Sequence, residues 1–171
     1  MNTHARSLVR FTVNGAPVSV EASGLVRLSE VLRERLGLVA SKVGCGVGRC
    51  GACIVLVDAE PTNACLVMAQ RLDGVDVVTP EGVDRYPEAR VLKQALAEEN
   101  AFQCGYCAPG FVMSLTALLR ACPNPDDARV RAALEGNLCR CTGYHSILRG
   151  AFRAAERLAE RASAGQPGDP S

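Results

Sequence analysis

Nine cysteines in a chain of 171 residues constrain this sequence more than any other feature. Eight of them form two groups of four: Cys45, Cys50, Cys53 and Cys65, and then Cys104, Cys107, Cys139 and Cys141. The N-terminal residues contain no apolar stretch of signal-peptide length, so we expect a cytoplasmic, reducing setting. Clustered cysteines in such a compartment serve as metal ligands or reactive thiols more often than as disulfides. The sequence therefore predicts a fold built around two metal centres.

The first three members of the first group have the spacing C-x4-C-x2-C, which is the spacing of plant-type [2Fe–2S] ferredoxins, and the fourth follows after eleven intervening residues, sooner than in those ferredoxins. Its loop, from Gly44 to Cys53, contains four glycines. Glycine admits unusual backbone angles and lets N–H groups approach the sulfurs of a cluster. A structural zinc site is the alternative, although zinc sites more often pair two C-x2-C units.

The second group pairs C-x2-C, at Cys104 and Cys107, with C-x-C, at Cys139 and Cys141. A C-x2-C pair alone could be a redox dithiol, but such a motif belongs to a βαβ context, and its surroundings here are predicted to be helical. Two facing pairs would make a second four-thiolate site, for which zinc is again the alternative. Cys122 is left over, and we expect it to be a free, buried thiol without a function.

Charge and hydropathy exclude several classes of protein. Nineteen Lys and Arg against eighteen Asp and Glu give a net charge of +1, without the basic excess typical of nucleic-acid or anionic-membrane binders. The longest apolar runs, Ile54 to Val57 and Ala64 to Ala69, are far shorter than the ~18 residues of a membrane span. The chain has no recognisable arrangement of acid, base and nucleophile, so no catalytic residue is assigned.

The first eighty residues are predicted to be rich in β-structure. Residues from Leu8 to Glu21 alternate around an Asn14-Gly15 turn, as in a β-hairpin. Ser29 is a plausible N-cap for a short helix that ends at Gly37. Strands are expected at 54–57 and 75–78, with a turn from Asp58 to Pro61 between them.

The rest of the chain is predicted to be helical, which makes the fold class α+β. Residues 81–90 are polar and contain Gly and Pro, so they are expected to link a domain at 1–80 to a domain at 91–161. Apolar residues recur at helical spacing in three segments, and Asn124 or Asp126 could cap a further helix ending at Gly136. Four helices around a common site are therefore expected. Residues 162–171 are expected to be a disordered tail.

Three strings of sequence, GCGVGRCGACIVLVD with NACL, QCGYCAPG and GNLCRCTGYHSI, together resemble the small iron–sulfur subunit of the molybdenum hydroxylases. This family includes xanthine dehydrogenase, aldehyde oxidoreductase and aerobic carbon monoxide dehydrogenase. The resemblance covers roughly residues 8 to 160. It implies an N-terminal β-grasp ferredoxin domain and a C-terminal helical bundle, with one [2Fe–2S] cluster on each group of four cysteines.

The resemblance also implies partners. A large subunit would bind the molybdopterin cofactor and the substrate, and Gln103 and Cys141 would contact the pterin. Electrons would pass through the helical-domain cluster and then the N-terminal cluster to an acceptor. The run from Cys141 to Tyr144 is more similar to the members that use a medium subunit with FAD. The alternatives are a free-standing ferredoxin-like carrier and a structural zinc protein.

Overall fold

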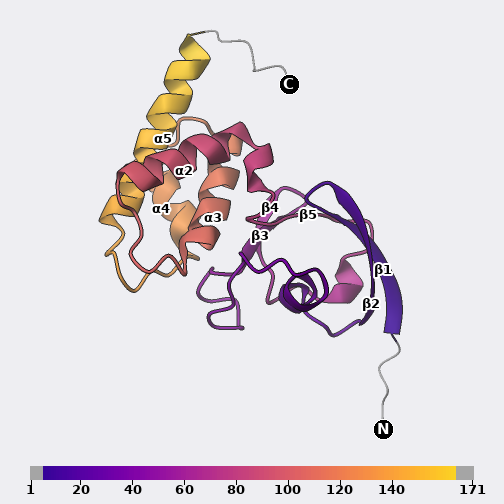
Figure 1. Cartoon of the computed structure of the whole chain (residues 1–171). Coiled ribbons are helices and arrows are strands. Elements are labelled where there is room, and N and C mark those ends of the chain that lie inside the picture. The colour runs from indigo at the N-terminus through magenta and orange to yellow at the C-terminus, as the bar shows by residue number, and fades with distance from the viewer. Residues whose placement is uncertain (1–5, 165–171) are drawn as a thin grey trace.

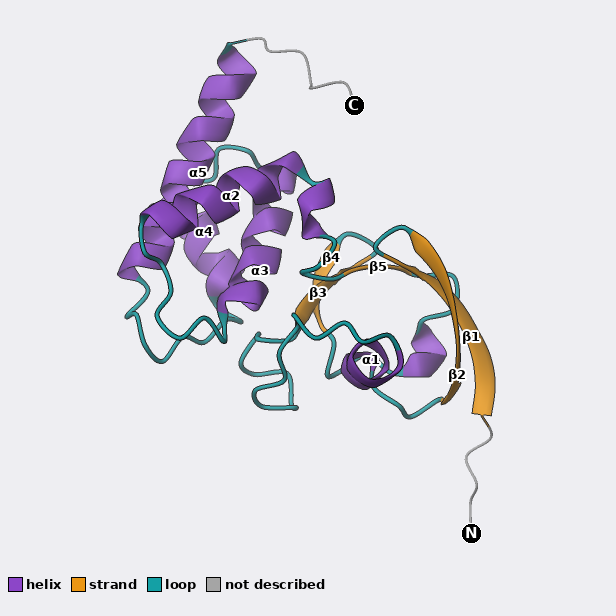
Figure 2. Cartoon of the chain, in the orientation of Figure 1, coloured by secondary structure: helices purple, strands orange, loops and turns teal. Residues whose placement is uncertain are grey.

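The computed structural model describes residues 6–164. These residues form a sheet-containing unit followed by a helical unit, which lie against each other (Figure 1). The strands belong to the first half of the chain and the long helices to the second (Figure 2). This order confirms the predicted α+β class. No helix in the described part of the chain is both long and apolar enough to cross a membrane.

The N-terminal unit is a mixed five-stranded sheet in the order β2-β1-β5-β3-β4. Its strands are β1 (Arg6–Val13), β2 (Ala16–Ser23), β3 (Ile54–Val57), β4 (Glu60–Asn63) and β5 (Asp76–Val78). β1 pairs with β2 antiparallel and with β5 parallel, and β3 is antiparallel to both of its neighbours. This arrangement is the expected β-grasp sheet.

The β1–β2 hairpin forms where it was predicted. Val9, Phe11 and Val13 alternate on the buried face of β1. The turn residues Asn14 and Gly15 have φ angles of 54° and 85°, as a two-residue hairpin turn with the twist of the strands requires. Local sequence is therefore sufficient to determine this hairpin.

The helical segment beside the sheet differs from the prediction. It consists of a single turn, α1 (Leu28–Glu30), which continues into a π-helical turn from Val31 to Arg35. Arg27, and not Ser29, occupies the N-cap position, and no side chain caps this end. Ser29 is itself buried, and its N–H donates to the carbonyl of Ala64 at 3.1 Å. Tertiary contact, rather than a side-chain cap, therefore fixes the start of this helix.

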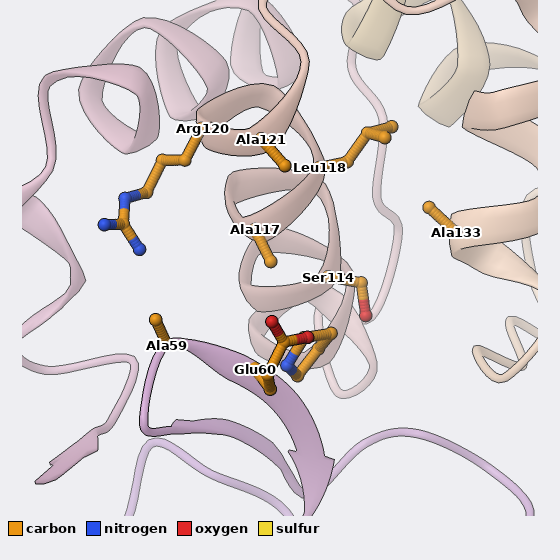
Figure 3. Close-up of a pocket in the computed structure, with 9 residues that line it drawn as sticks. Ala59, Glu60, Ser114, Ala117, Leu118, Arg120, Ala121 and Ala133 are labelled. Carbon is orange, nitrogen blue, oxygen red and sulfur yellow. The ribbon is translucent and has the colours of Figure 1, made fainter.

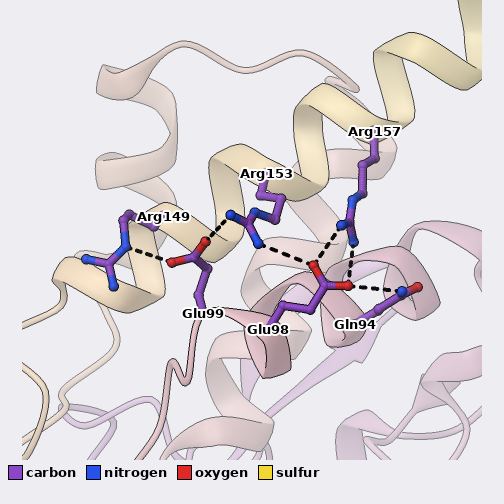
Figure 4. Close-up of polar contacts among 6 residues, drawn as sticks. All are labelled: Gln94, Glu98, Glu99, Arg149, Arg153 and Arg157. Atoms are coloured by element: carbon purple, nitrogen blue, oxygen red, sulfur yellow. Dashed lines mark hydrogen bonds and ion pairs between the residues drawn. The ribbon is translucent and has the colours of Figure 1, made fainter.

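The helical unit contains α2 (Pro87–Glu98), α3 (Ala108–Ala121), α4 (Asp127–Leu134) and α5 (His145–Ser163). The predicted cap at Asp126 is confirmed, because its carboxylate accepts a hydrogen bond from the N–H of Arg129 at 2.8 Å. Three arginines of α5 form ion pairs with two glutamates at the end of α2 (Figure 4): Arg149 and Arg153 with Glu99, and Arg153 and Arg157 with Glu98. Most of the predicted tail, residues 165–171, lies outside the described residues.

The segment expected as a linker is folded. Residues 81–90 contain a 3-10 turn from Val83 to Arg85 and the first turn of α2, which begins at Pro87. Val83 is buried. Glu81 accepts hydrogen bonds from the N–H of Ala40 at 2.8 Å and from the hydroxyl of Thr79 at 2.6 Å. The connection is therefore anchored to the N-terminal unit.

The two units also share a strand. Successive side chains of a strand point to opposite faces, and β3 uses both faces. Ile54 and Leu56 belong to the hydrophobic core of the helical unit, whereas Val55 belongs to the core of the N-terminal unit. This double burial fixes the orientation of the loop that precedes β3.

Candidate functional site

The first group of cysteines, called here the N-terminal thiol set, lies on the loop before β3 and on the segment after β4. Its members are Cys45, Cys50, Cys53 and Cys65. They form two contacting pairs, Cys45 with Cys50 and Cys53 with Cys65. The first pair includes the exposed Cys45, while both members of the second pair are buried. The predicted glycine requirement is confirmed, because Gly46, Gly48 and Gly51 all have positive φ.

The environments of these thiols differ in electrostatics. The backbone N–H groups of Val47 and Arg49 donate to the sulfur of Cys45 at 3.4 and 3.2 Å. Because these donors stabilise the thiolate, they lower the pKa of Cys45 to about 6. Burial raises the pKa of Cys53 to about 11; the backbone of Cys65 opposes this effect, while the thiol of Cys65 adds to it. The loop therefore supplies N–H donors to the exposed thiol of Cys45, whereas the thiol of Cys53 is buried.

The second group, the helical thiol set, connects the start of α3 to the loop between α4 and α5. Its members are Cys104, Cys107, Cys139 and Cys141. The sulfurs of Cys104 and Cys141 are 3.8 Å apart and exposed. Cys107 contacts Cys139, and burial, followed by this contact, raises the pKa of Cys107 to about 12.

Tyr144 supports the helical thiol set, and sequence reasoning assigned it no role. Its hydroxyl accepts a hydrogen bond from the N–H of Cys139 and donates one to the carbonyl of Asn137, both at 3.0 Å. The hydroxyl of Thr142 donates to the sulfur of Cys139 at 3.1 Å. The backbone carrying Cys139 is therefore held by residues that immediately precede α5.

The arrangement in pairs fits a two-iron cluster. A [2Fe–2S] cluster is held by four thiolates shared between two irons, so it matches two adjacent pairs. A tetrahedral zinc site instead requires four sulfurs around one ion. In both sets the chemistry of the donors and their grouping therefore fit a [2Fe–2S] cluster.

The two sets meet across the boundary between the units. Cys50 and all four members of the helical thiol set line one cavity of about 170 Å³. The N–H of Leu138 donates to the carbonyl of Cys50 at 3.0 Å. The hydroxyl of Tyr106 donates to the carbonyl of Val43 at 3.0 Å. Contacts between the ligand loops thus place the two sets next to each other.

The remaining predicted residues have separate positions. Gln103 is exposed, and its Nε2 donates to the carbonyl of Cys141 at 3.1 Å. Cys122 belongs to neither set and is only half-buried, so the prediction of a buried thiol is wrong. Its sulfur accepts a hydrogen bond from the Arg129 guanidinium at 3.1 Å. A larger hollow, of about 410 Å³ between α3, α4 and the β3–β4 turn, contains no cysteine (Figure 3).

Comparison with known families agrees with this division. Residues 11–76 match the family described as "2Fe-2S iron-sulfur cluster binding domain". Residues 79–152 match the family described as "[2Fe-2S] binding domain". Each match contains one complete thiol set, so the chain has two [2Fe–2S]-binding domains in the predicted order.

Several known proteins are similar to this chain over nearly its whole length. The xanthine dehydrogenase iron-sulfur-binding subunit of Escherichia coli is 42% identical over 151 residues, covering 86% of this chain and 94% of that protein. The nicotinate dehydrogenase small FeS subunit of Eubacterium barkeri is 39% identical, covering 88% of this chain and 96% of that protein. In the crystal structure of quinoline 2-oxidoreductase from Pseudomonas putida 86, a chain with 33% identity superposes with a TM-score of 0.83, covering 95% of this chain and 99% of that one. This chain therefore belongs to the family of small iron–sulfur subunits of the molybdenum hydroxylases, and it is an electron-transfer component of an oxidoreductase.

Proposed function

We propose that this chain passes single electrons from a molybdopterin site on a large partner subunit to an acceptor on a second partner. The proposed ligands of its two [2Fe–2S] clusters are Cys45, Cys50, Cys53, Cys65, Cys104, Cys107, Cys139 and Cys141. The observation that carries this proposal is the shared cavity, which Cys50 lines together with the whole helical thiol set. Each cluster, when bound, supplies a centre that accepts and releases one electron at a time.

The exposed edges of the two sets supply an entry and an exit. Cys104 and Cys141 are exposed on the helical side, with Gln103 held beside them. Their position supports the proposal that Gln103 and Cys141 face the pterin of the large subunit. In the N-terminal thiol set, Cys45 is exposed between Val43 and Val47, which are themselves exposed. We propose that the acceptor, FAD on a medium subunit, lies against this second edge.

The surface around the sets favours a permanent subunit over a free carrier. A free carrier that docks transiently would present a charged face. Here several large apolar side chains are exposed around the sets, and they are Val43, Val47, Leu66, Tyr106 and Leu138. Exposed apolar groups that cluster at one site indicate protein–protein contact. We place the assembly in the cytoplasm, because none of the nine cysteines, all of them among the described residues, forms a disulfide.

Single-ligand substitutions test the assignment of the clusters. In the co-expressed complex, Cys50→Ser should abolish the N-terminal cluster signal in electron paramagnetic resonance (EPR), and Cys107→Ser should abolish the other. Cys122→Ser is the matched control and should leave both signals intact, because Cys122 lies outside both sets. Iron and acid-labile sulfide should each approach about four per chain, as two [2Fe–2S] clusters require. Stoichiometric zinc without labile sulfide would refute the proposal.

The relay role needs a separate measurement. Substrate added to the complex should reduce both clusters in the wild type, as followed by visible absorbance. If the N-terminal cluster of Cys107→Ser is still reduced by substrate at the wild-type rate, then the helical thiol set is not on the route. A chain that is stable alone, and that reduces external acceptors without a large subunit, would support the free carrier instead.

A further inference from the structure

The two units approach each other closely through a contact of backbones at Gly51. This residue lies between the ligands Cys50 and Cys53, and its φ is +69°. A Cβ atom at Gly51 would lie 2.3 Å from the carbonyl oxygen of Gly136. On the other side, a Cβ atom at Gly110, in the first turn of α3, would lie 2.1 Å from the carbonyl oxygen of Gly51. Any side chain at Gly51 or Gly110 would therefore push the units apart.

Asn137 is also part of this contact between the units. Its side chain is 2% exposed, although Gly136 and Leu138 on either side are exposed. Its Oδ1 accepts a hydrogen bond from the hydroxyl of Ser114 on α3 at 2.9 Å. Its Nδ2 lies at the Gly51 backbone, 2.8 Å from the position that a Cβ there would take. One amide group thus contacts both α3 and the loop of the N-terminal thiol set.

The Nδ2 of Asn137 has no hydrogen-bond partner in the described part of the chain. Leaving a buried donor unpaired is costly, so an unpaired buried amide calls for a structural or functional explanation. The donor lies beside the Cys50–Gly51–Ala52–Cys53 segment, whose thiols are proposed to hold a cluster. The backbone of Asn137 is also fixed, because its N–H donates to Leu134 and its carbonyl accepts from Tyr144.

We propose that Asn137 is a positioning residue that sets the separation between the two thiol sets, an inference that rests on the proposed relay function. Its side chain fixes the Gly51 loop relative to α3, and its backbone leads through Leu138 directly to the ligand Cys139. Leu138 in turn donates to the carbonyl of Cys50. A shift of Asn137 would therefore move ligands of both sets relative to each other while leaving each set of four thiols intact.

Separation between the sets controls two measurable quantities. The rate of electron transfer falls steeply as the distance between two centres grows. The magnetic dipolar interaction between two reduced clusters falls with the cube of that distance, and it splits their EPR signals. A residue with only a structural role would change stability without changing this splitting. The splitting is therefore the readout that distinguishes positioning from general stabilisation.

The experiment compares Asn137→Ala with the wild type in the complex that holds both clusters. We expect Asn137→Ala to retain both cluster signals but to show a smaller splitting and slower reduction of the N-terminal cluster by substrate. Ser114→Ala removes only the hydrogen bond to Oδ1, so it should change the splitting in the same direction by less. Thr116→Val is the matched control. It removes the hydroxyl of Thr116, which is buried and has no hydrogen-bond partner among the described residues. Thr116 lies two positions after Ser114 on α3 and therefore on a different face of the helix.

Gly110→Ala tests the same separation independently. The new methyl group would meet the Gly51 carbonyl, and Gly110 lies in a helix, where alanine is well tolerated. It should also reduce the splitting. If Asn137→Ala and Gly110→Ala keep both cluster signals and show the wild-type splitting, this inference is overturned while the proposed function stands. If Asn137→Ala loses a cluster, wild-type splitting in Ser114→Ala and Gly110→Ala would overturn it. Absence of two cluster signals in the wild type would instead overturn the proposed function, and this inference with it.

Discussion

Tyr144→Phe is the substitution whose effect follows most directly from the structure. The hydroxyl of Tyr144 joins two backbone groups, accepting from the N–H of Cys139 and donating to the carbonyl of Asn137, each at 3.0 Å. Phenylalanine would keep the packing of the ring, whose centroid lies 5.9 Å from that of Phe111. The substitution therefore removes two hydrogen bonds and changes little else.

The size of the effect can be estimated from these contacts. At about 0.5–1.5 kcal/mol for each hydrogen bond, the loss of two lowers the free energy of unfolding by about 1–3 kcal/mol. With a urea dependence of about 1–3 kcal/mol per molar, the midpoint should fall by about 1 M. Because Cys139 is directly affected, the helical-domain cluster should be released before the N-terminal cluster.

The assay is the loss of visible absorbance and of each EPR signal during urea titration of the complex. Tyr106→Phe is the matched control, since its hydroxyl makes one hydrogen bond, to Val43, and the side chain is 50% exposed. Tyr106→Phe removes one hydrogen bond where Tyr144→Phe removes two, so it should shift the midpoint less. Equal midpoints for Tyr144→Phe and the wild type, or earlier loss of the N-terminal cluster, would refute the reasoning.

Three further predictions concern the scaffold. Phe111→Ala removes a fully buried ring and should lower the free energy of unfolding by about 3–5 kcal/mol in chemical denaturation. Glu99→Gln should lower the thermal midpoint by an amount that shrinks with added salt, because its partners Arg149 and Arg153 are exposed. Desolvation works to raise the pKa of Glu81, but the Thr79 hydroxyl and the Ala40 N–H outweigh it and hold the pKa below the ordinary 4.5. The wild type should therefore be more stable than Glu81→Gln above pH 4.5, and circular dichroism melts should show this difference vanish as the pH falls through the lowered pKa.

Much of the fold could be predicted because its signals are local. The β1–β2 hairpin and the cap at Asp126 each depend on a few adjacent residues. β4 was missed, because a turn was predicted from Asp58 to Pro61 and Glu60–Asn63 contains no Val, Ile or aromatic residue. It is an edge strand of the sheet, where a proline such as Pro61 is tolerated. The turn is in fact confined to Asp58 and Ala59, which both have positive φ.

The candidate site, too, could be predicted only where its signals are local. Cysteine spacing was enough to divide eight thiols into two sets, since the members of a set mostly lie on shared loops. The pairing within each set, such as Cys104 with Cys141, depends on how two distant segments fold together. The contact of Gly51 with Gly110 and Asn137 depends on the docking of two units, and no local pattern encodes it. The role of Tyr144 escaped prediction for the same reason.

The two thiol sets differ in how deeply their cysteines are buried. Each set has one pair that is more exposed than the other: Cys45 with Cys50, and Cys104 with Cys141. Exposure and hydrogen bonding to sulfur tune the potential of an iron–sulfur cluster. In the N-terminal thiol set, the sulfur of the exposed Cys45 accepts hydrogen bonds from two backbone N–H groups, while Cys53 and Cys65 are buried. The helical thiol set has no fully buried member. Two clusters held in such different surroundings should differ in potential, and redox titration of the complex should resolve two separate midpoints. A single shared midpoint would mean that the protein environment does not separate them.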